Sequence, residues 1–146
     1  LLAQLEAITG QDSDTIANLA NASAALNMSL PQINWAGFYL VRENELVLDP
    51  FQGKVACRRI QFGKGVCGAA AASGCTQRVE NVHTFTGHIA CDSASNSEIV
   101  IPLRHNGKLV AVLDIDSPFY GRFTKENQDG LEQCAALIAK SCDWKI

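Results

Sequence analysis

Six cysteines in 146 residues are the feature of this sequence with the greatest capacity for chemistry. They are Cys57, Cys67, Cys75, Cys91, Cys134 and Cys142. A chain of this length buries enough surface to fold without disulfides, and no secretory leader is recognisable, so reactive or redox thiols are favoured over structural disulfides. No two cysteines have the C-x₂₋₄-C spacing of structural zinc sites, which argues against such a site.

Two of these cysteines are candidate nucleophiles. Cys91 precedes a run of small polar residues, DSASNS (92–97), so a substrate could approach its sulfur closely. A nearby histidine or backbone donors could give this thiol the thiolate character that attack requires. Cys67 lies in a glycine-rich turn, GKGVCG (63–68), that leads into a helix, and helix N-termini lower the pKa of a thiol. The chemistry alone leaves the choice between them open.

Three carboxylates form a second candidate group. Asp114 and Asp116 share one face of the strand LVAVLDID (109–116), because side chains alternate between faces along a strand. Glu98 lies on the neighbouring strand of a predicted hairpin and could reach the same place. One interpretation is a solvated strand end. The other is a cavity over the sheet, where like charges and desolvation raise a pKa until one acid stays protonated.

An aromatic pair lies on one face of an earlier predicted strand. Trp35, Gly37 and Tyr39 share that face, and Ala36 and Phe38 point to the opposite one. Aromatic residues in a strand are more often core than pocket. The glycine between them nevertheless leaves space beside two rings that carry polar atoms, which would suit a ligand.

The remaining candidates have ordinary explanations. Cys75, Cys134 and Cys142 are placed at a helix end or along a helix, and we assign them no function. His83 and His88 are interpreted as loop or core histidines.

The elements that must position these residues follow from the apolar patterns. Helices are expected within residues 1–30, broken at Gly10, with Asp12 and Ser13 as a cap before the apolar stripe Ile16, Leu19, Ala20, Ser23 and Leu26. Strands are expected at 33–41, 46–48, 58–62, 76–79, 98–103 and 108–115, with a short helix at 69–72 and a last helix at 124–142.

Three local sequence features predict where elements end, turn or are capped. Asp49-Pro50 is expected to end the second strand, and Asn106-Gly107 to form the turn of a hairpin. Thr124, with Asn127 and Gln128, is expected to cap the last helix. An irregular stretch at 80–97 contains Cys91, and long loops in compact domains are usually functional or disordered. The order predicts an α+β domain with one antiparallel sheet and helices packed on it.

The overall charge narrows the function classes. Twelve basic and fifteen acidic residues give a net charge of −3, with no basic stripe for nucleic acid. There is no apolar run of 18 residues that could cross a membrane. We therefore expect a cytoplasmic protein that binds neither nucleic acid nor membrane.

Together these segments closely resemble the free methionine-(R)-sulfoxide reductases built on a GAF domain, a fold related to PAS. The matching runs are NWAGFYL (34–40), PFQGKVACRRI (50–60), GKGVCG (63–68), HIACDSASNSEIVIPL (88–103) and VLDIDS (112–117). Each run alone is weak, but the ordered set is highly specific. The resemblance implies one GAF domain over residues 1–146, with N-terminal helices at 1–30, the catalytic sheet and loops at 33–117 and a C-terminal helix at 124–142.

The resemblance also implies the chemistry. Cys91 would attack the sulfur of free L-methionine (R)-S-oxide and become a sulfenic acid, which Cys57 would resolve as a disulfide, with Cys67 as an auxiliary thiol. A thioredoxin-type reductant would regenerate the enzyme, without a metal or organic cofactor. The acids at 98, 114 and 116 would hold the sulfoxide oxygen and the substrate ammonium, and one of them would donate a proton. Trp35 and Tyr39 would contact the S-methyl end.

Two other functions remain open at this point. One is a GAF sensor that binds a small ligand without catalysis, which an assay of turnover separates from an enzyme. The other is a thiol redox sensor, which needs no pocket acids and should survive Glu98→Gln. The expected partners are free methionine sulfoxide and the thioredoxin-type reductant. The sequence allows a homodimer and does not define the oligomeric state.

Overall fold

The structure is a computed structural model that describes residues 1–87 and 94–146. Its helices are α1 (Leu2–Thr9), α2 (Thr15–Ser29), α3 (Gly65–Ser73) and α4 (Lys125–Ser141), with a 3₁₀ turn, η1, at Val82–Thr84. Its strands are β1 (Trp35–Arg42), β2 (Glu45–Gly53), β3 (Arg59–Gln61), β4 (Gln77–Val79), β5 (Ser97–His105) and β6 (Lys108–Ser117). The candidate residues His88 and Cys91 lie outside the described residues.

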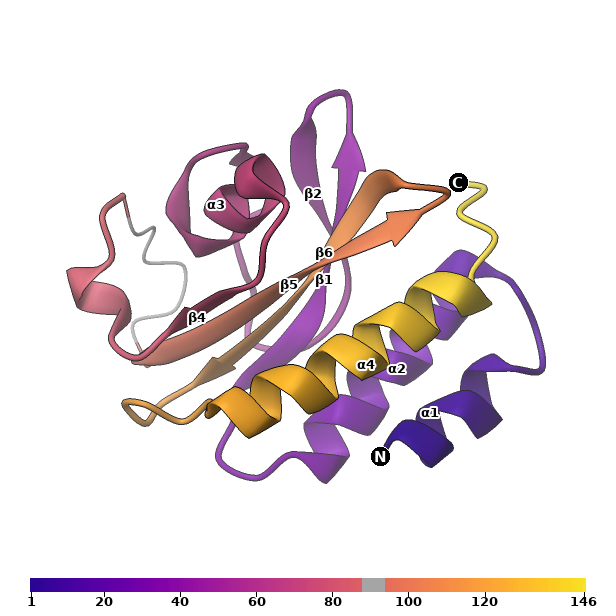
Figure 1. Cartoon of the computed structure of the whole chain (residues 1–146), viewed down its shortest axis with the longest axis horizontal. Helices are drawn as coiled ribbons and strands as arrows, with labels where there is room; N and C mark the ends of the chain where they lie inside the picture. The colour runs from indigo at the N-terminus through magenta and orange to yellow at the C-terminus, as the bar shows by residue number, and fades with distance from the viewer. Residues whose placement is uncertain (88–93) are drawn as a thin grey trace.

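The strands form one sheet with helices on both of its faces. The strand order is β3-β2-β1-β6-β5-β4, and every neighbouring pair is antiparallel. Helices α1, α2 and α4 cover one face, whereas α3 lies on the other (Figure 1). The predicted α+β architecture with a single antiparallel sheet is therefore confirmed.

The alternation of side chains along β1 divides the interior into two cores. Phe38 and Leu40 are fully buried beneath α1, α2 and α4. Trp35 and Tyr39 point to the opposite face and pack in the cluster that contains the α3 residue Val66. The α3 side of the sheet thus holds the polar candidates, while the other side is an apolar core that anchors the strands.

Strand β2 is longer than predicted, because Asp49-Pro50 does not end it. The register between β1 and β2 shifts at this point: Tyr39 pairs with Leu48, and Gly37 pairs with Phe51. Two residues of β2 therefore stand opposite one residue of β1, as in a β-bulge. A proline is tolerated at a bulge because it interrupts no regular ladder hydrogen bond there.

The helices at the N-terminal end of the chain differ from the prediction in detail. The cap of α2 is Asp14, which accepts a hydrogen bond from the Ala17 N–H, and not Asp12 or Ser13. Ile16 is 39% exposed, and Ala20 is exposed as well. The buried residues of α2 are instead Thr15, Asn18, Leu19, Ala22, Ser23 and Leu26. Polar side chains are among them because they find partners; Asn18 Nδ2, for example, donates to the Asp12 carbonyl at 2.7 Å.

The predicted hairpin turn at Asn106-Gly107 and the predicted helix cap at Thr124 are confirmed. Asn106 and Gly107 both have positive φ, as a tight hairpin turn requires. The Thr124 hydroxyl accepts from the Asn127 N–H at 3.1 Å, and the Asn127 side chain accepts from the Thr124 N–H at 2.9 Å. Helix α3 begins at Gly65, four residues earlier than expected, and ends at Gly74 in the left-handed conformation.

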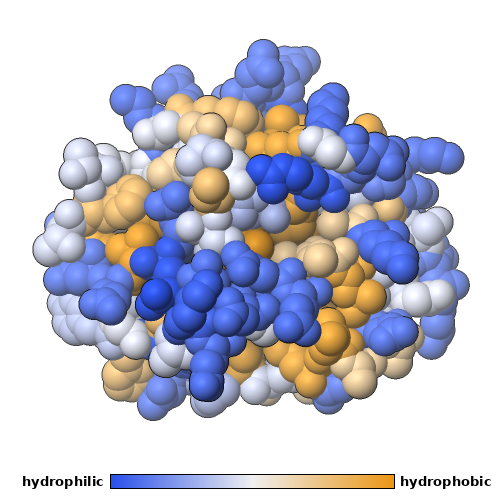
Figure 2. Space-filling model, in the orientation of Figure 1, coloured by the Kyte–Doolittle hydropathy of each residue, from blue (hydrophilic) through white to orange (hydrophobic). Residues whose placement is uncertain are grey.

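No described helix is both long and apolar enough to cross a membrane. On the face seen in Figure 2, hydrophilic residues alternate with smaller groups of hydrophobic ones.

Candidate active site

A small pocket lies between α3 and the polar face of the sheet, with a volume of about 50 Å³. It is lined by Trp35, Tyr39, Val55, Ala56, Ile60, Lys64, Gly65, Val66, Cys67, Ser95, Glu98, Asp114 and Asp116. Strand pairing explains why the acids and aromatics meet here. Trp35 and Glu98 each stand opposite Asp116, and Gly37 stands opposite Asp114. Residues in such register on adjacent strands point to the same face.

The three predicted acids all line this pocket. Glu98 is 9% exposed and Asp114 is 6% exposed, so neither belongs to a solvated strand end. No ion pair joins either carboxylate to a described basic residue. Burial raises the pKa of Glu98 and of Asp114 well above its usual range, and a neighbouring carboxylate adds to the effect in each case. These acids therefore retain protons at a pH where ordinary carboxyls have lost them.

Asp116 lies at the outer part of the same group. The Ser95 hydroxyl donates to Asp116 Oδ2 at 3.4 Å, and Ser95 in turn accepts from Asn34 Nδ2 at 3.3 Å. This chain of hydrogen bonds fixes the carboxylate against the start of β1. Asp116 is half-buried, in contrast to the fully enclosed Asp114.

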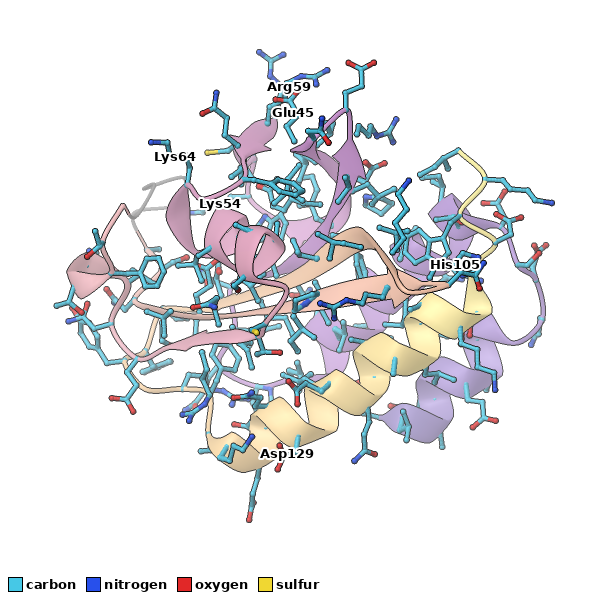
Figure 3. The ribbon with its side chains drawn as sticks, turned by 45° about the horizontal axis from the view of Figure 1, so that its top comes forward. Glu45, Lys54, Arg59, Lys64, His105 and Asp129 are labelled. Atoms are coloured by element: carbon cyan, nitrogen blue, oxygen red, sulfur yellow. The ribbon has the colours of Figure 1, made fainter. Side chains whose placement is uncertain are left out.

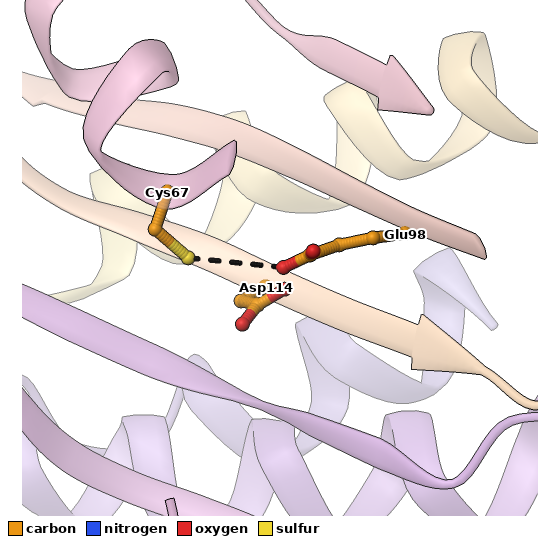
Figure 4. Close-up of side chains that lie close together, drawn as sticks. All are labelled: Cys67, Glu98 and Asp114. Carbon is orange, nitrogen blue, oxygen red and sulfur yellow. Dashed lines mark hydrogen bonds between the residues drawn. The ribbon is translucent and has the colours of Figure 1, made fainter. Parts of the chain in front are cut away.

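Cys67 is enclosed in the pocket, and its predicted acidity is wrong. The thiol is 4% exposed and donates a hydrogen bond to Glu98 Oε2 at 3.9 Å (Figure 4). Burial raises the pKa of Cys67 well above its usual range, and the charges of Asp114 and Glu98 raise it further. Desolvation and the nearby acids thus raise the pKa of this thiol more than the helix N-terminus lowers it. The thiol therefore stays protonated and is not a ready nucleophile.

The two pocket aromatics are held by hydrogen bonds to the loop that follows β2. Trp35 Nε1 donates to the Lys54 carbonyl at 3.0 Å, and the Tyr39 hydroxyl donates to the Cys57 carbonyl at 3.0 Å. The two rings stack with centroids 6.0 Å apart. Burial, aided by the nearby acids, raises the pKa of Tyr39, so its phenol remains a donor.

Gly37 does not provide ligand space, contrary to the interpretation from its sequence position. A Cβ built on Gly37 would lie 2.2 Å from Phe51 Cβ and 2.9 Å from the Trp35 ring. The missing side chain makes room for the β-bulge and lets Trp35 stack on Phe51, with ring centroids 5.1 Å apart. The glycine therefore positions the pocket wall rather than widening the pocket.

The predicted resolving cysteine lies beside this pocket. Cys57 is half-buried, follows the lining residue Ala56 and forms a disulfide. The thiols of Cys67, Cys75, Cys134 and Cys142 are free. Among these, only Cys67 lines the pocket, whereas Cys134 and Cys142 pack in the core on the opposite face of the sheet.

Two lining residues escaped the sequence interpretation. Lys64 is the only cation in the lining that the structure describes, and it occupies the N-cap position of α3 (Figure 3). Ser95 is 6% exposed and reaches the acids, although its sequence context suggested only a small polar loop residue. The available signal for Lys64 was its place in the glycine-rich turn GKGVCG (63–68) that leads into the helix. His83 is exposed, contacts Asn96 at 2.8 Å and does not line the pocket.

Comparison with known proteins agrees with this architecture. The family model for the GAF domain matches residues 14–142. The chain is 54% identical to the free methionine-R-sulfoxide reductase of Escherichia coli over 134 residues, which cover 92% of this chain and 81% of that protein.

Two solved structures are similar throughout. The reduced form of fRMsr from Staphylococcus aureus is 48% identical with a TM-score of 0.94, covering 96% of this chain and 91% of that one. The free methionine-R-sulfoxide reductase of Neisseria meningitidis, in complex with its substrate, is 43% identical with a TM-score of 0.94, covering 98% and 86%. The shared sequence and fold together establish that the chain belongs to the GAF-domain family of free methionine-R-sulfoxide reductases.

Proposed function

We propose that the protein reduces free L-methionine (R)-S-oxide to L-methionine by thiol chemistry. The observation that carries this function is a small pocket that is lined by three acids, two of them buried, and by a stacked aromatic pair. Relatives that are named free methionine-R-sulfoxide reductases, one of them solved with its substrate, support the same reaction.

The acids supply the proton that this reaction needs. Sulfoxide sulfur is a poor electrophile until its oxygen is protonated or strongly hydrogen-bonded. Glu98 and Asp114 keep raised pKa values because they are buried, so a protonated carboxyl is available as a general acid at a pH where ordinary carboxyls are ionised. The neighbouring carboxylates can at the same time accept hydrogen bonds from the substrate ammonium.

Cys91 acts as the nucleophile in this proposal. Its thiolate attacks the sulfoxide sulfur, a pocket acid protonates the oxygen, and the oxygen leaves with Cys91 as a sulfenic acid while methionine departs. The Cys57 thiol then attacks the sulfenic sulfur, which forms the disulfide and releases water. The disulfide at Cys57 supports a resolving role, and the raised pKa of Cys67 supports only an auxiliary one.

A dithiol protein of the thioredoxin type returns the disulfide to two thiols by exchange. Cys57 is half-buried rather than enclosed, which supports access for such a reductant. Four free cysteines among the described residues support a reducing compartment, in keeping with a cytoplasmic location.

The pocket favours the free amino acid over a methionine residue in a protein. Trp35 and Tyr39 provide an apolar wall for the S-methyl end, while the buried carboxylates match an ammonium that a peptide bond would remove.

The test is release of methionine with dithiothreitol as the reductant. The protein is offered the resolved R and S sulfoxides, each as the free amino acid and within a peptide. We expect methionine from the free R form alone. No methionine from any of the four substrates, with the protein folded and reduced, would contradict the proposed function.

A matched pair of variants separates catalysis from redox sensing. Glu98→Gln should lower turnover by about 10²–10⁴-fold, the usual contribution of a general acid. Glu126→Gln, on the exposed first turn of α4, should leave turnover unchanged. If Glu98→Gln kept full turnover, the pocket acids would have no part in the reaction.

A further inference from the structure

The pocket also holds a set of donor atoms that is suited to a metal ion. One atom each from Cys67, Glu98 and Asp114 forms a group in which all three atoms lie within 4.8 Å of one another. The three residues come from α3, β5 and β6, and their side chains converge on one point (Figure 4). The three residues are far apart in the sequence, so no short spacing motif could have predicted this group.

The group has an electrostatic need for a cation. All three residues are buried, and within the described part of the chain neither carboxylate forms an ion pair with a basic side chain. The Asp114 Oδ1 atom has no hydrogen-bond partner among the described residues, although Asp114 is only 6% exposed. A buried oxygen in this condition is costly, and a bound cation would relieve the cost.

The geometry suits a small tetrahedral ion. With bonds of about 2.3 Å to sulfur and about 2.1 Å to oxygen, a tetrahedral zinc site separates these two donors by about 3.6 Å. The distance from Cys67 Sγ to Glu98 Oε2 is 3.9 Å. A shift of a few tenths of an ångström is therefore enough to bring both donors to one ion.

The donor types select the class of ion. A thiolate with two carboxylates favours a borderline ion such as Zn²⁺ over the hard ions Mg²⁺ and Ca²⁺, which require six or more oxygen ligands. The pocket volume of about 50 Å³ accommodates one ion with a water in its fourth position, but not an octahedral hydration shell.

We propose that Cys67, Glu98 and Asp114 form a binding site for Zn²⁺ or a similar borderline divalent ion. The ion displaces the thiol proton and any proton held by the carboxyls, forms one metal–sulfur and two metal–oxygen bonds, and is neither oxidised nor reduced. It occupies the place of the substrate ammonium, so metal and amino acid exclude each other. The bound metal is thus a reversible inhibitor that a chelator removes.

The experiment uses Co²⁺ as a spectroscopic probe and needs no turnover. The protein is prepared without reductant and shown by thiol titration to have four free thiols, so that Cys57 remains in its disulfide. Titration with Co²⁺ should produce a thiolate-to-cobalt charge-transfer band that saturates at one ion per chain. Zn²⁺ should abolish the band, and excess Mg²⁺ should not.

Two cysteine variants test the assignment of the ligand. Cys67→Ser should lose the charge-transfer band, whereas Cys75→Ser, which removes an exposed thiol outside the pocket, should keep it. Asp114→Asn should weaken Co²⁺ binding by at least about tenfold, since even the loss of an outer partner costs that much. If Cys67→Ser does not fold, Glu98→Gln tests the site instead: it keeps the thiolate and its band but should weaken Co²⁺ binding.

Three results would overturn the metal site: no saturable band, an equal band in Cys67→Ser, or unchanged affinity in Asp114→Asn. Addition of free L-methionine should weaken Co²⁺ binding more than the same concentration of L-alanine, which chelates free Co²⁺ through the same amino and carboxylate groups. That last measurement alone rests on the proposed function. If it fails while the variants behave as expected, the metal site stands and the position of the substrate ammonium is wrong.

Discussion

Replacing Asp114 by asparagine is expected to stabilise the free protein while it abolishes activity. The wild-type side chain is 6% exposed, and its Oδ1 atom finds no hydrogen-bond partner in residues 1–87 and 94–146. A buried polar atom in this state costs about 1–3 kcal/mol of folding free energy. Asparagine keeps the shape, cannot ionise and offers an N–H donor to Glu98. We therefore expect a gain of about 2 kcal/mol, which raises the melting temperature by about 4–8 °C in a chain of this size.

The pH dependence of this gain follows from the raised pKa of Asp114. Above the ordinary carboxyl range the native wild type binds more protons than its unfolded state, so its stability falls as pH rises toward the raised pKa. The asparagine variant lacks this titration. Its advantage over wild type should therefore be largest at pH 8 and smallest at pH 4, where the pH approaches the unfolded carboxyl pKa.

The assay is thermal unfolding followed by circular dichroism at pH 4, 5, 6, 7 and 8 and constant ionic strength, beside methionine release. Asp129→Asn is the control, because Asp129 is exposed on α4 and pairs only with the exposed Lys125 (Figure 3). That variant should change stability by no more than about 0.5 kcal/mol at any pH. A lower melting temperature for Asp114→Asn at every pH would refute the reasoning and make this acid a structural residue.

Three further predictions concern the nucleophile, the pocket wall and the core. Cys91→Ser should abolish even a single turnover, whereas Cys57→Ser should permit one and stop recycling; equal yields of methionine from one turnover would contradict these roles. Gly37→Ala should raise the KM for the sulfoxide and cost about 1–3 kcal/mol in denaturant unfolding, because its Cβ would lie 2.2 Å from Phe51 Cβ. Phe38→Ala should cost about 3–5 kcal/mol yet keep kcat below its melting temperature, since Phe38 is fully buried on the other face; a lost kcat in the folded variant would argue against two separate cores.

Local patterns in the sequence were sufficient for most of the fold. Alternation along a strand assigned Trp35 and Tyr39 to one face and Phe38 to the other, as the two cores confirm. The Asn106-Gly107 turn and the cap at Thr124 were predictable because each depends on a few neighbouring residues. The burial of polar residues such as Asn18 in α2 was not predictable, because their hydrogen-bond partners lie far along the chain.

What only the tertiary structure decided is the chemical state of the site. The sequence predicted three acids on adjacent strands, but their desolvation depends on α3, which covers the sheet from elsewhere in the chain. The same burial reverses the expectation for Cys67, whose pKa rises because acids from β5 and β6 surround it. Side-chain direction is a local property of the backbone, whereas the pKa of a group depends on every element packed against it. The sequence therefore determined which residues share a face, and the packing of α3 determined what those residues can do.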